Sequence, residues 1–246
     1  MGEREPVTSS PHPVELGPAL EKWLLREGDP SVQYRVLQDV LERSPTDPEV
    51  LAAKQRIGQE GWAAGLLADQ LEDGHWVTVG RDRPASLYMP KYVVTNWRLI
   101  VASDVGMTRE DPRVERAARL LLEQWGGPTG AVGGTVSELC ITGNAVRMML
   151  RFGLGEVPEV ATGLDWLVQV QKPDGGWHCF PSPTGTLDCW EALAAFGALP
   201  RERWTEAIDR SVRRGAEFYL ERGLLTESDG SSCGPWRRYH YPHHYF

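Results

Sequence analysis

The chain of 246 residues is 41% hydrophobic and 24% charged, the composition of an ordinary globular protein with enough apolar material for a sizeable core. Its formal net charge of -8, with no basic run beyond two short arginine pairs, argues against a nucleic-acid partner. No segment is apolar enough to be a signal peptide or to span a bilayer, so we expect a cytoplasmic protein without a transmembrane segment.

Residues 1–14 are polar and contain prolines, so we expect a flexible N-terminal segment. We expect residues 15–246 to form one domain, because repeat architectures commonly reach this size as a single unit. Capping residues and apolar spacing predict four helices in the first third of the chain, at 18–28, 30–43, 48–59 and 61–71.

From there on, a helical pattern recurs with a period of roughly 45–50 residues, which is typical of two-helix repeats. One helix of each pair is amphipathic and opens on proline or a polar cap, near Pro112, Pro158 and Trp204. Its partner is apolar on most faces, as an inner helix usually is, and is expected to start near Tyr92, Leu139 and Leu187.

About ten helices with short connections can form either a superhelical solenoid or a closed ring of hairpins. We predict an all-α fold of the alpha-alpha toroid type, with inner and outer layers of helices. The period calls for one more helix after the last residues of the sequence, so we expect the toroid to be incomplete at its C-terminus.

Glycine-rich turns follow two of the outer helices. The clearer one is Gln-Lys-Pro-Asp-Gly-Gly-Trp at 171–177, and a related turn, Gln-Leu-Glu-Asp-Gly-His-Trp, occupies 70–76. The aspartate can cap the following backbone, glycine permits positive φ, and the indole of the tryptophan can cover a helix end. We therefore interpret both turns as staples between repeats rather than as reacting groups.

These turns resemble the QW motif of squalene and oxidosqualene cyclases and the matching turn of protein prenyltransferases. The chain looks like a member of the prenyltransferase and squalene-oxidase repeat family, and this resemblance implies the toroid fold and a cyclase or transferase acting on an isoprenoid. A closer resemblance is to uncharacterised bacterial members, through the Cys-x-x-Gly-Asn stretch at 140–144 and the Trp-x-Cys stretch at 177–179. This closer likeness implies no particular activity.

The chain departs from both enzyme groups in its functional motifs. The cyclases use an Asp-x-Asp-Asp proton donor, whereas this sequence offers only single carboxylates such as Asp165 and Asp188. The prenyltransferases bind zinc through Asp-x-Cys and a histidine one repeat later. Glu138-Leu139-Cys140 resembles the first part, and Asp188-Cys189 stands near the place of the histidine, so the resemblance implies a zinc site.

Three cysteines and their neighbours are the candidate metal ligands. Cys140 and Cys189 lie about one repeat apart near the starts of inner helices, with Cys179 in the loop between them, and zinc prefers sulfur and nitrogen ligands. The hypothesis is a zinc ion held by these three thiols, with one further ligand from His178, Glu138 or Asp188. The alternative is that the cysteines are small core residues.

Aromatic and sulfur side chains are candidates for lining an apolar cavity: Trp97, Met148, Met149 and Trp190 on inner helices, and Tyr239 and His240 near the C-terminus. The first function hypothesis is therefore an isoprenoid or other apolar small molecule bound or converted there. The second is a helical-repeat protein-interaction module without catalysis. A cysteine nucleophile with His178 or His240 as base is a third, weaker hypothesis.

Overall fold

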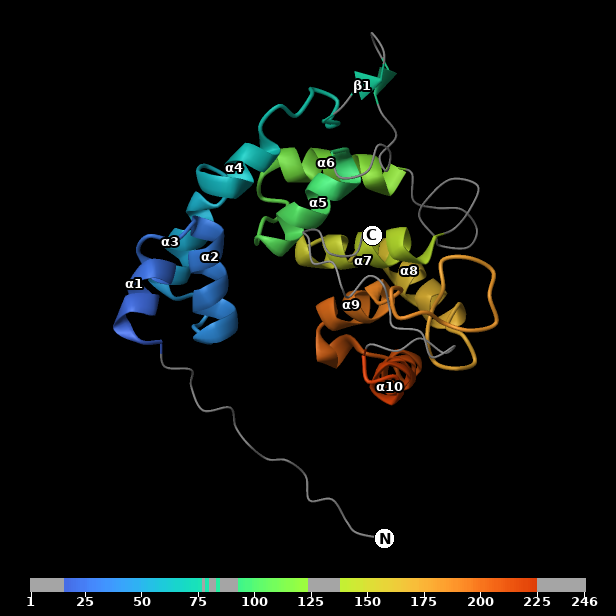
Figure 1. The fold of residues 1–246 in the computed structure, drawn as a ribbon. Helices are drawn as coiled ribbons and strands as arrows, with labels where there is room; N and C mark the ends of the chain where they lie inside the picture. The colour runs from blue at the N-terminus through green and yellow to red at the C-terminus, as the bar shows by residue number, and fades with distance from the viewer. Residues whose placement is uncertain (1–15, 77, 80–82, 85–92, 124–137, 225–246) are drawn as a thin grey trace. The chain divides into compact units, whose positions relative to one another are not determined.

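The computed structural model describes residues 16–76, 78–79, 83–84, 93–123 and 138–224 (Figure 1). Most of these residues are helical, which confirms the all-α prediction. They form two compact units that divide after Ala68. The expected flexible segment 1–14 lies outside the described residues, and the single domain 15–246 stays a prediction.

The first unit is a small cluster of helices: α1 (Pro18–Leu25), α2 (Pro30–Arg35), the π-helical turn η1 (Val36–Val40), α3 (Pro48–Arg56) and α4 (Gly61–Leu67). Its core contains Leu37, Val50 and Ala53. The carboxylate of Asp29 accepts hydrogen bonds from the backbone N–H groups of Ser31 and Trp62, at 2.9 and 2.7 Å. It therefore caps α2 and ties it to the start of α4.

The second unit begins with the turn at 70–76 and a pair of two-residue antiparallel strands, β1 (Thr78–Val79) and β2 (Arg83–Pro84). Among the described residues of this unit, six α-helices and one 3-10 turn follow. Their bounds are α5 (Thr95–Asp104), α6 (Pro112–Glu123), α7 (Leu139–Arg151), α8 (Pro158–Gln169), α9 (Glu191–Ala198), η2 (Arg201–Arg203) and α10 (Glu206–Glu221).

These helices have the inner and outer layers of a toroid-type hairpin repeat. The inner helix α7 packs against both α5 and α9, the neighbouring inner helices, as Figure 1 shows. The outer helix of each pair packs on its inner partner, and α10 also contacts α8. In α7 every residue from Ile141 to Met149 is buried, as expected for an inner helix.

The third inner helix starts later than predicted. The expectation was a start near Leu187, but α9 begins at Glu191. The backbone N–H of Thr186 is bonded to the carbonyl of Trp177 at 2.8 Å, and Cys189 N–H turns back to the carbonyl of Thr186 at 3.3 Å. The backbone N–H groups of Thr186 and Cys189 are therefore hydrogen-bonded within a bridge and a turn. Cys189 thus lies at the end of the loop and not in α9.

Among the described residues, no helix combines the length and the apolar character needed to cross a membrane.

Candidate functional site

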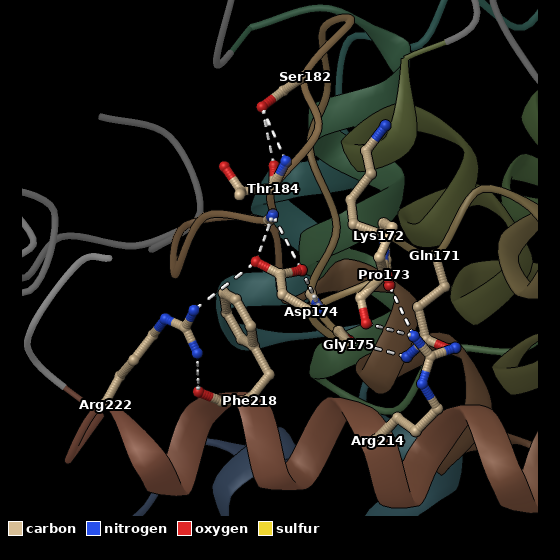
Figure 2. Close-up of polar contacts among 12 residues, drawn as sticks. Gln171, Lys172, Pro173, Asp174, Gly175, Ser182, Thr184, Arg214, Phe218 and Arg222 are labelled. Carbon is tan, nitrogen blue, oxygen red and sulfur yellow. Dashed lines mark hydrogen bonds and ion pairs between the residues drawn. The ribbon is translucent and has the colours of Figure 1, made fainter. Parts of the chain in front are cut away.

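The loop from α8 to α9 is fixed to α10 by Gln171 (Figure 2). The side-chain amide of Gln171 donates to the carbonyls of Gly175 and Ser211, both at 2.8 Å. Arg214 of α10 donates to the carbonyls of Lys172 and Pro173 at 2.8 and 3.0 Å. The first half of the loop is therefore held by side-chain bonds to the outer layer.

Asp174 holds the next part of the same loop. Its carboxylate accepts from the backbone N–H groups of Gly176 at 3.1 Å and Gly185 at 3.0 Å, and pairs with Arg222 at 3.6 Å, as Figure 2 shows in part. Gly175 has φ of +91°, a conformation that side chains with a Cβ rarely adopt. The loop is thereby closed on itself just before Trp177, His178 and Cys179.

Trp177 is fully buried, and its indole N–H donates to the carbonyl of Leu167 at 2.9 Å. The earlier turn repeats this construction: the amide of Gln70 donates to the carbonyls of Gly74 at 3.2 Å and Arg113 at 2.8 Å. Gly74 has φ of +95°. Both turns act as staples to the next outer helix, in agreement with the interpretation drawn from the sequence.

The three predicted cysteines come together at the start of α7 and α9. Cys140 is the second residue of α7, Cys179 lies in the stapled loop, and Cys189 stands two residues before α9. The sulfur atoms of Cys179 and Cys189 are 3.7 Å apart, and Cys179 also shares a hydrogen bond with Cys140. All three are free thiols.

Oxygen atoms surround these thiols. The sulfur of Cys140 lies 3.9 Å from Oε2 of Glu138, and the hydroxyl of Thr186 donates to the sulfur of Cys189 at 3.4 Å. Asp188, next to Cys189, is exposed. Carboxylate and thiolate groups are both ligands of zinc, so the immediate surroundings of the cluster supply candidates of both kinds.

The thiols disfavour one another's ionisation. The hydrogen bond with Cys140 raises the pKa of Cys179 above its usual value, and burial adds to this. The hydrogen bond with Cys179 raises the pKa of Cys189, followed by burial and by the nearby charge of Asp188. Because a thiolate is the reactive form, the raised pKa values argue against the cysteine-nucleophile hypothesis for these two residues.

A buried carboxyl group lies beside the cluster. Glu191 is the first residue of α9 and is 1% exposed, and neither of its carboxyl oxygens has a hydrogen-bond partner among the described residues. Burial is the main cause that raises its pKa well above the ordinary value, with the charge of Cys189 as the next contribution. On the facing helix, the side-chain oxygen of the buried Asn144 also lacks a partner, while its amide donates to the carbonyl of Cys140 at 2.9 Å.

Glu191 and Asn144 were not among the residues predicted from the sequence. A signal for Glu191 existed, because it is the charged residue within the otherwise apolar stretch from Trp190 to Leu199. A carboxyl group on an inner helix has to be buried, and buried carboxyl groups need compensation. Cysteine spacing carries no information about such a carboxyl group.

The remaining predicted ligand, His178, lies in the loop next to Cys179. Its Nδ1 accepts a hydrogen bond from the backbone N–H of Phe180 at 2.9 Å, so this nitrogen is occupied within the loop. Within the described part of the chain, no group of three or more His, Cys, Asp or Glu side chains is placed so as to hold a metal ion. Zinc binding would therefore require the ligands around the thiol cluster to move closer together.

The predicted cavity residues are buried in the inner layer. Trp97 is 1% exposed, and Met148 and Met149 are fully buried, while Trp190 is half-buried under the guanidinium of Arg147, 5.8 Å from the ring centroid. Their role in lining a cavity stays a prediction. Tyr239 and His240 lie outside the described residues.

Two pockets lie away from these residues. One, of about 300 Å³, is in the first unit between α1, α2 and α3, and is lined by both charged and apolar side chains. The other, of about 640 Å³, is an open depression along α10 and includes Arg201, Trp204 and Arg210. Neither contains the thiol cluster or Glu191.

No protein-family model and no curated protein matches the chain. Among solved structures, ent-copalyl diphosphate synthase from Streptomyces platensis is similar with a TM-score of 0.49 and 18% identity, covering 76% of this chain and 35% of the synthase. The type II terpene cyclase MstE from Scytonema has a TM-score of 0.44 and 13% identity, covering 64% of this chain and 48% of the cyclase.

A mutant of the family 10 polysaccharide lyase from Cellvibrio cellulosa is also similar, with a TM-score of 0.46 and 15% identity over 70% of this chain and 72% of the lyase. This chain spans about a third of the length of the synthase and about half of the length of MstE. At such identities and TM-scores these likenesses assign no activity to the chain.

Proposed function

We propose that the second unit binds zinc at the thiol cluster of Cys140, Cys179 and Cys189 and binds an apolar, isoprenoid-type small molecule beside it. The observation that carries the proposal is the meeting of three free thiols from α7, the stapled loop and the start of α9. Scattered through the sequence, they meet at one end of the inner layer.

The distance between two of the sulfur atoms supports zinc. Ligands about 2.3 Å from a tetrahedral ion lie roughly 3.8 Å from one another, and the sulfur atoms of Cys179 and Cys189 are 3.7 Å apart. Bound zinc would supply a Lewis acid that activates a thiol or water ligand.

The proposal of an isoprenoid-type ligand is supported by the character of the inner helices. Most of the buried side chains of α7 and α9 are aliphatic, aromatic or sulfur-bearing, and such side chains suit an apolar chain of carbon atoms. The resemblance of the repeat turns to those of terpenoid cyclases and prenyltransferases points to the same class of ligand. Cyclase-type protonation through an Asp-x-Asp-Asp motif has no counterpart in the sequence.

Metal analysis of the purified protein tests the zinc part. We expect about one zinc per chain in the wild type, and its loss in the Cys140→Ser, Cys189→Ser double variant. Cys233→Ser, which removes the cysteine that the proposal does not use, is the matched control and should keep the metal. A wild type that binds no zinc after dialysis against the metal, or a double variant that retains it stoichiometrically, overturns the zinc site.

Quenching of tryptophan fluorescence by farnesol tests the ligand part. Saturable quenching in the wild type, and its weakening in Met148→Lys, would support binding within the inner layer, because a buried ammonium group disfavours an apolar ligand. Circular dichroism must show that the variant is folded, and Met148→Leu serves as the volume-conserving control. Quenching that does not saturate, or that the folded lysine variant leaves unchanged, contradicts the proposal.

Two observations favour the alternative of a protein-interaction module. Trp97, Met148 and Met149 are almost completely buried among other side chains, as in a filled core. The first unit also exposes large aromatic side chains, with Trp23 62% and Trp62 65% exposed. Aromatic residues are enriched at protein interfaces. If the protein binds neither zinc nor farnesol, this result would favour the interaction module.

A further inference from the structure

Cys179 and Cys189 are two free thiols in direct contact. Their sulfur atoms are 3.7 Å apart. A disulfide joins two sulfur atoms at about 2.0 Å, so forming the bond requires the sulfur atoms to approach by roughly 1.7 Å, a shift that rotation of the two side chains can supply. The pair therefore meets the first geometric requirement for a disulfide.

Hydrogen bonds of the backbone hold the two cysteines near each other. Trp177, two residues before Cys179, forms a bridge with Thr186, whose N–H donates to the carbonyl of Trp177 at 2.8 Å. The N–H of Cys189 in turn donates to the carbonyl of Thr186 at 3.3 Å. The contact between the sulfur atoms is thus a consequence of how the loop is bonded.

The two thiols differ in their access to water. Cys179 is half-buried, whereas Cys189 is 4% exposed. An oxidant dissolved in water reaches the sulfur of Cys179 more easily. Cysteines that respond to oxidants are typically accessible and lie next to a second cysteine that completes the disulfide. The pair has this arrangement, with Cys179 as the accessible thiol and Cys189 as the second one.

We propose that Cys179 and Cys189 form a redox modification site, at which hydrogen peroxide converts the two thiols into a disulfide. The sulfur of Cys179 attacks the peroxide and breaks its O–O bond, which leaves a sulfenic acid on Cys179 and releases one water. The sulfur of Cys189 then attacks the sulfenic sulfur, the S–S bond forms, and a second water leaves. Two thiols are oxidised and one peroxide is reduced to two waters.

The reaction is expected to be slow. Hydrogen bonds among the thiols raise the pKa of both Cys179 and Cys189, and burial adds to the effect. Because the thiolate is the attacking form, a raised pKa lowers the rate of each step. It does not change which sulfur atoms are in contact, so the product is still the disulfide between these two residues.

This inference goes beyond the proposed zinc site and does not depend on it. The disulfide and the zinc ion would use the same two sulfur atoms, and zinc binds thiolates. Each state therefore excludes the other. Oxidation would leave Cys140 as the remaining thiol of the cluster, and bound zinc would protect the pair from peroxide.

Peptide mapping by mass spectrometry tests the proposal on the folded, full-length protein. The protein is reduced, freed of metal with a chelator and treated with hydrogen peroxide, and the remaining thiols are then alkylated under denaturing conditions. Trypsin does not cleave before Pro173, so it leaves both cysteines in one peptide, 152–201, which contains no other cysteine. We expect this peptide to lose two hydrogens and to escape alkylation.

Cleavage before Asp188 gives a second readout, because it separates the two cysteines. The two resulting peptides should stay joined until a reductant is added. Cys140→Ser and Cys233→Ser are the matched controls. Both keep the pair, so both should form the same link as the wild type.

Two further variants test the order of the steps, after circular dichroism has shown that they are folded. Cys189→Ser should accumulate a sulfenic acid on Cys179 that dimedone traps, because the second thiol is absent. Cys179→Ser should leave the buried Cys189 without a dimedone label. If Cys189→Ser does not fold, the maps of the wild type and of Cys140→Ser still test the link itself.

The outcomes separate this proposal from the zinc site. Two free thiols after peroxide, a sulfinic acid on Cys179 without a link, or a link to Cys140 overturns the proposal. Dimedone labelling of Cys189 in folded Cys179→Ser overturns the order of attack. A wild type that forms the link but binds no zinc overturns only the zinc site, and one that binds zinc but forms no link after metal removal overturns only this inference.

Discussion

Gly143 of α7 lies directly against the backbone of Glu191 of α9. A Cβ atom on Gly143 would be 2.7 Å from the carbonyl carbon of Glu191 and 2.8 Å from its Cβ. Only a residue without a side chain allows this approach, so the two inner helices are in contact through their backbones at the level of the thiol cluster. The position of Glu191 therefore depends on the glycine that faces it.

Gly143→Ala should destabilise the protein by about 1–3 kcal/mol, the usual cost of adding atoms to a well-packed interior. Gly197→Ala, in the same α9, is the matched control: Gly197 is exposed and a Cβ there would meet nothing within 4 Å. It should be neutral or stabilising by up to ~1 kcal/mol, because alanine is the better helix former. Urea unfolding measures both, and equal stabilities for the two variants would contradict the close contact.

Trp177→Ala should lower the free energy of unfolding by roughly 3–5 kcal/mol, the usual range for deleting a large buried aromatic side chain. The variant loses the packing of a fully buried ring and the bond to the carbonyl of Leu167. Phe180→Ala in the same loop, where the ring is 61% exposed, is the comparison and should cost much less. A change under about 1 kcal/mol for Trp177→Ala would show that the ring is not buried.

Gln171→Ala and Gln70→Ala should destabilise the second unit by similar amounts, about 1–3 kcal/mol each, because each removes an amide that bonds two backbone carbonyls. Lys172→Ala is the control, because the ammonium group of Lys172, next to Gln171, bonds to none of the residues drawn in Figure 2. Thermal unfolding of the three variants measures this. A strong effect at one glutamine and none at the other would mean that the turns are not equivalent.

Asp111→Asn should show a pH-dependent loss of stability. Burial raises the pKa of Asp111, but its hydrogen bonds with Arg113 outweigh this, so the pKa is lowered from 3.8. A lowered pKa stabilises the folded state above the unfolded value, and this contribution is lost as the pH falls through the folded value. The variant should be about 0.2–1 kcal/mol less stable than the wild type at pH 7, the range of solvent-screened ion pairs, with the difference vanishing below the lowered pKa. A difference that persists there would assign the effect to something other than charge.

The sequence predicted the fold better than the site because the two depend on different information. Helical spacing and proline caps are local, and they placed the start of α7 at Leu139 and the starts of two outer helices at Pro112 and Pro158 as the structure has them. The start of α9 was placed too early because Thr186 pairs with Trp177, a contact across the loop that the local pattern does not contain.

For the site, the repeat period predicted that Cys140, Cys179 and Cys189 would meet, and in the structure the sulfur atoms of Cys179 and Cys189 are 3.7 Å apart. It could not reveal the unpaired carboxyl of Glu191, since this depends on which face of α9 is turned toward α7 and on the absence of a side chain at Gly143. Nor could it show that Nδ1 of His178 is used by the backbone of Phe180. Both features depend on which residues lie close together in the folded chain, and residue type alone does not predict this.

The two glutamine staples reach only from one outer helix region to the next: Gln70 bonds the backbone at Arg113, and Gln171 bonds the backbone at Ser211. At these two places, one hairpin is thus joined to the next by a side chain from the turn between them. In such arrays stability is a sum of neighbour terms, so a hairpin carrying its own glutamine turn can be duplicated or deleted without rewriting the others. The thiol cluster, by contrast, takes its cysteines from α7, the loop after α8 and the start of α9, so it depends on two successive hairpins being present together.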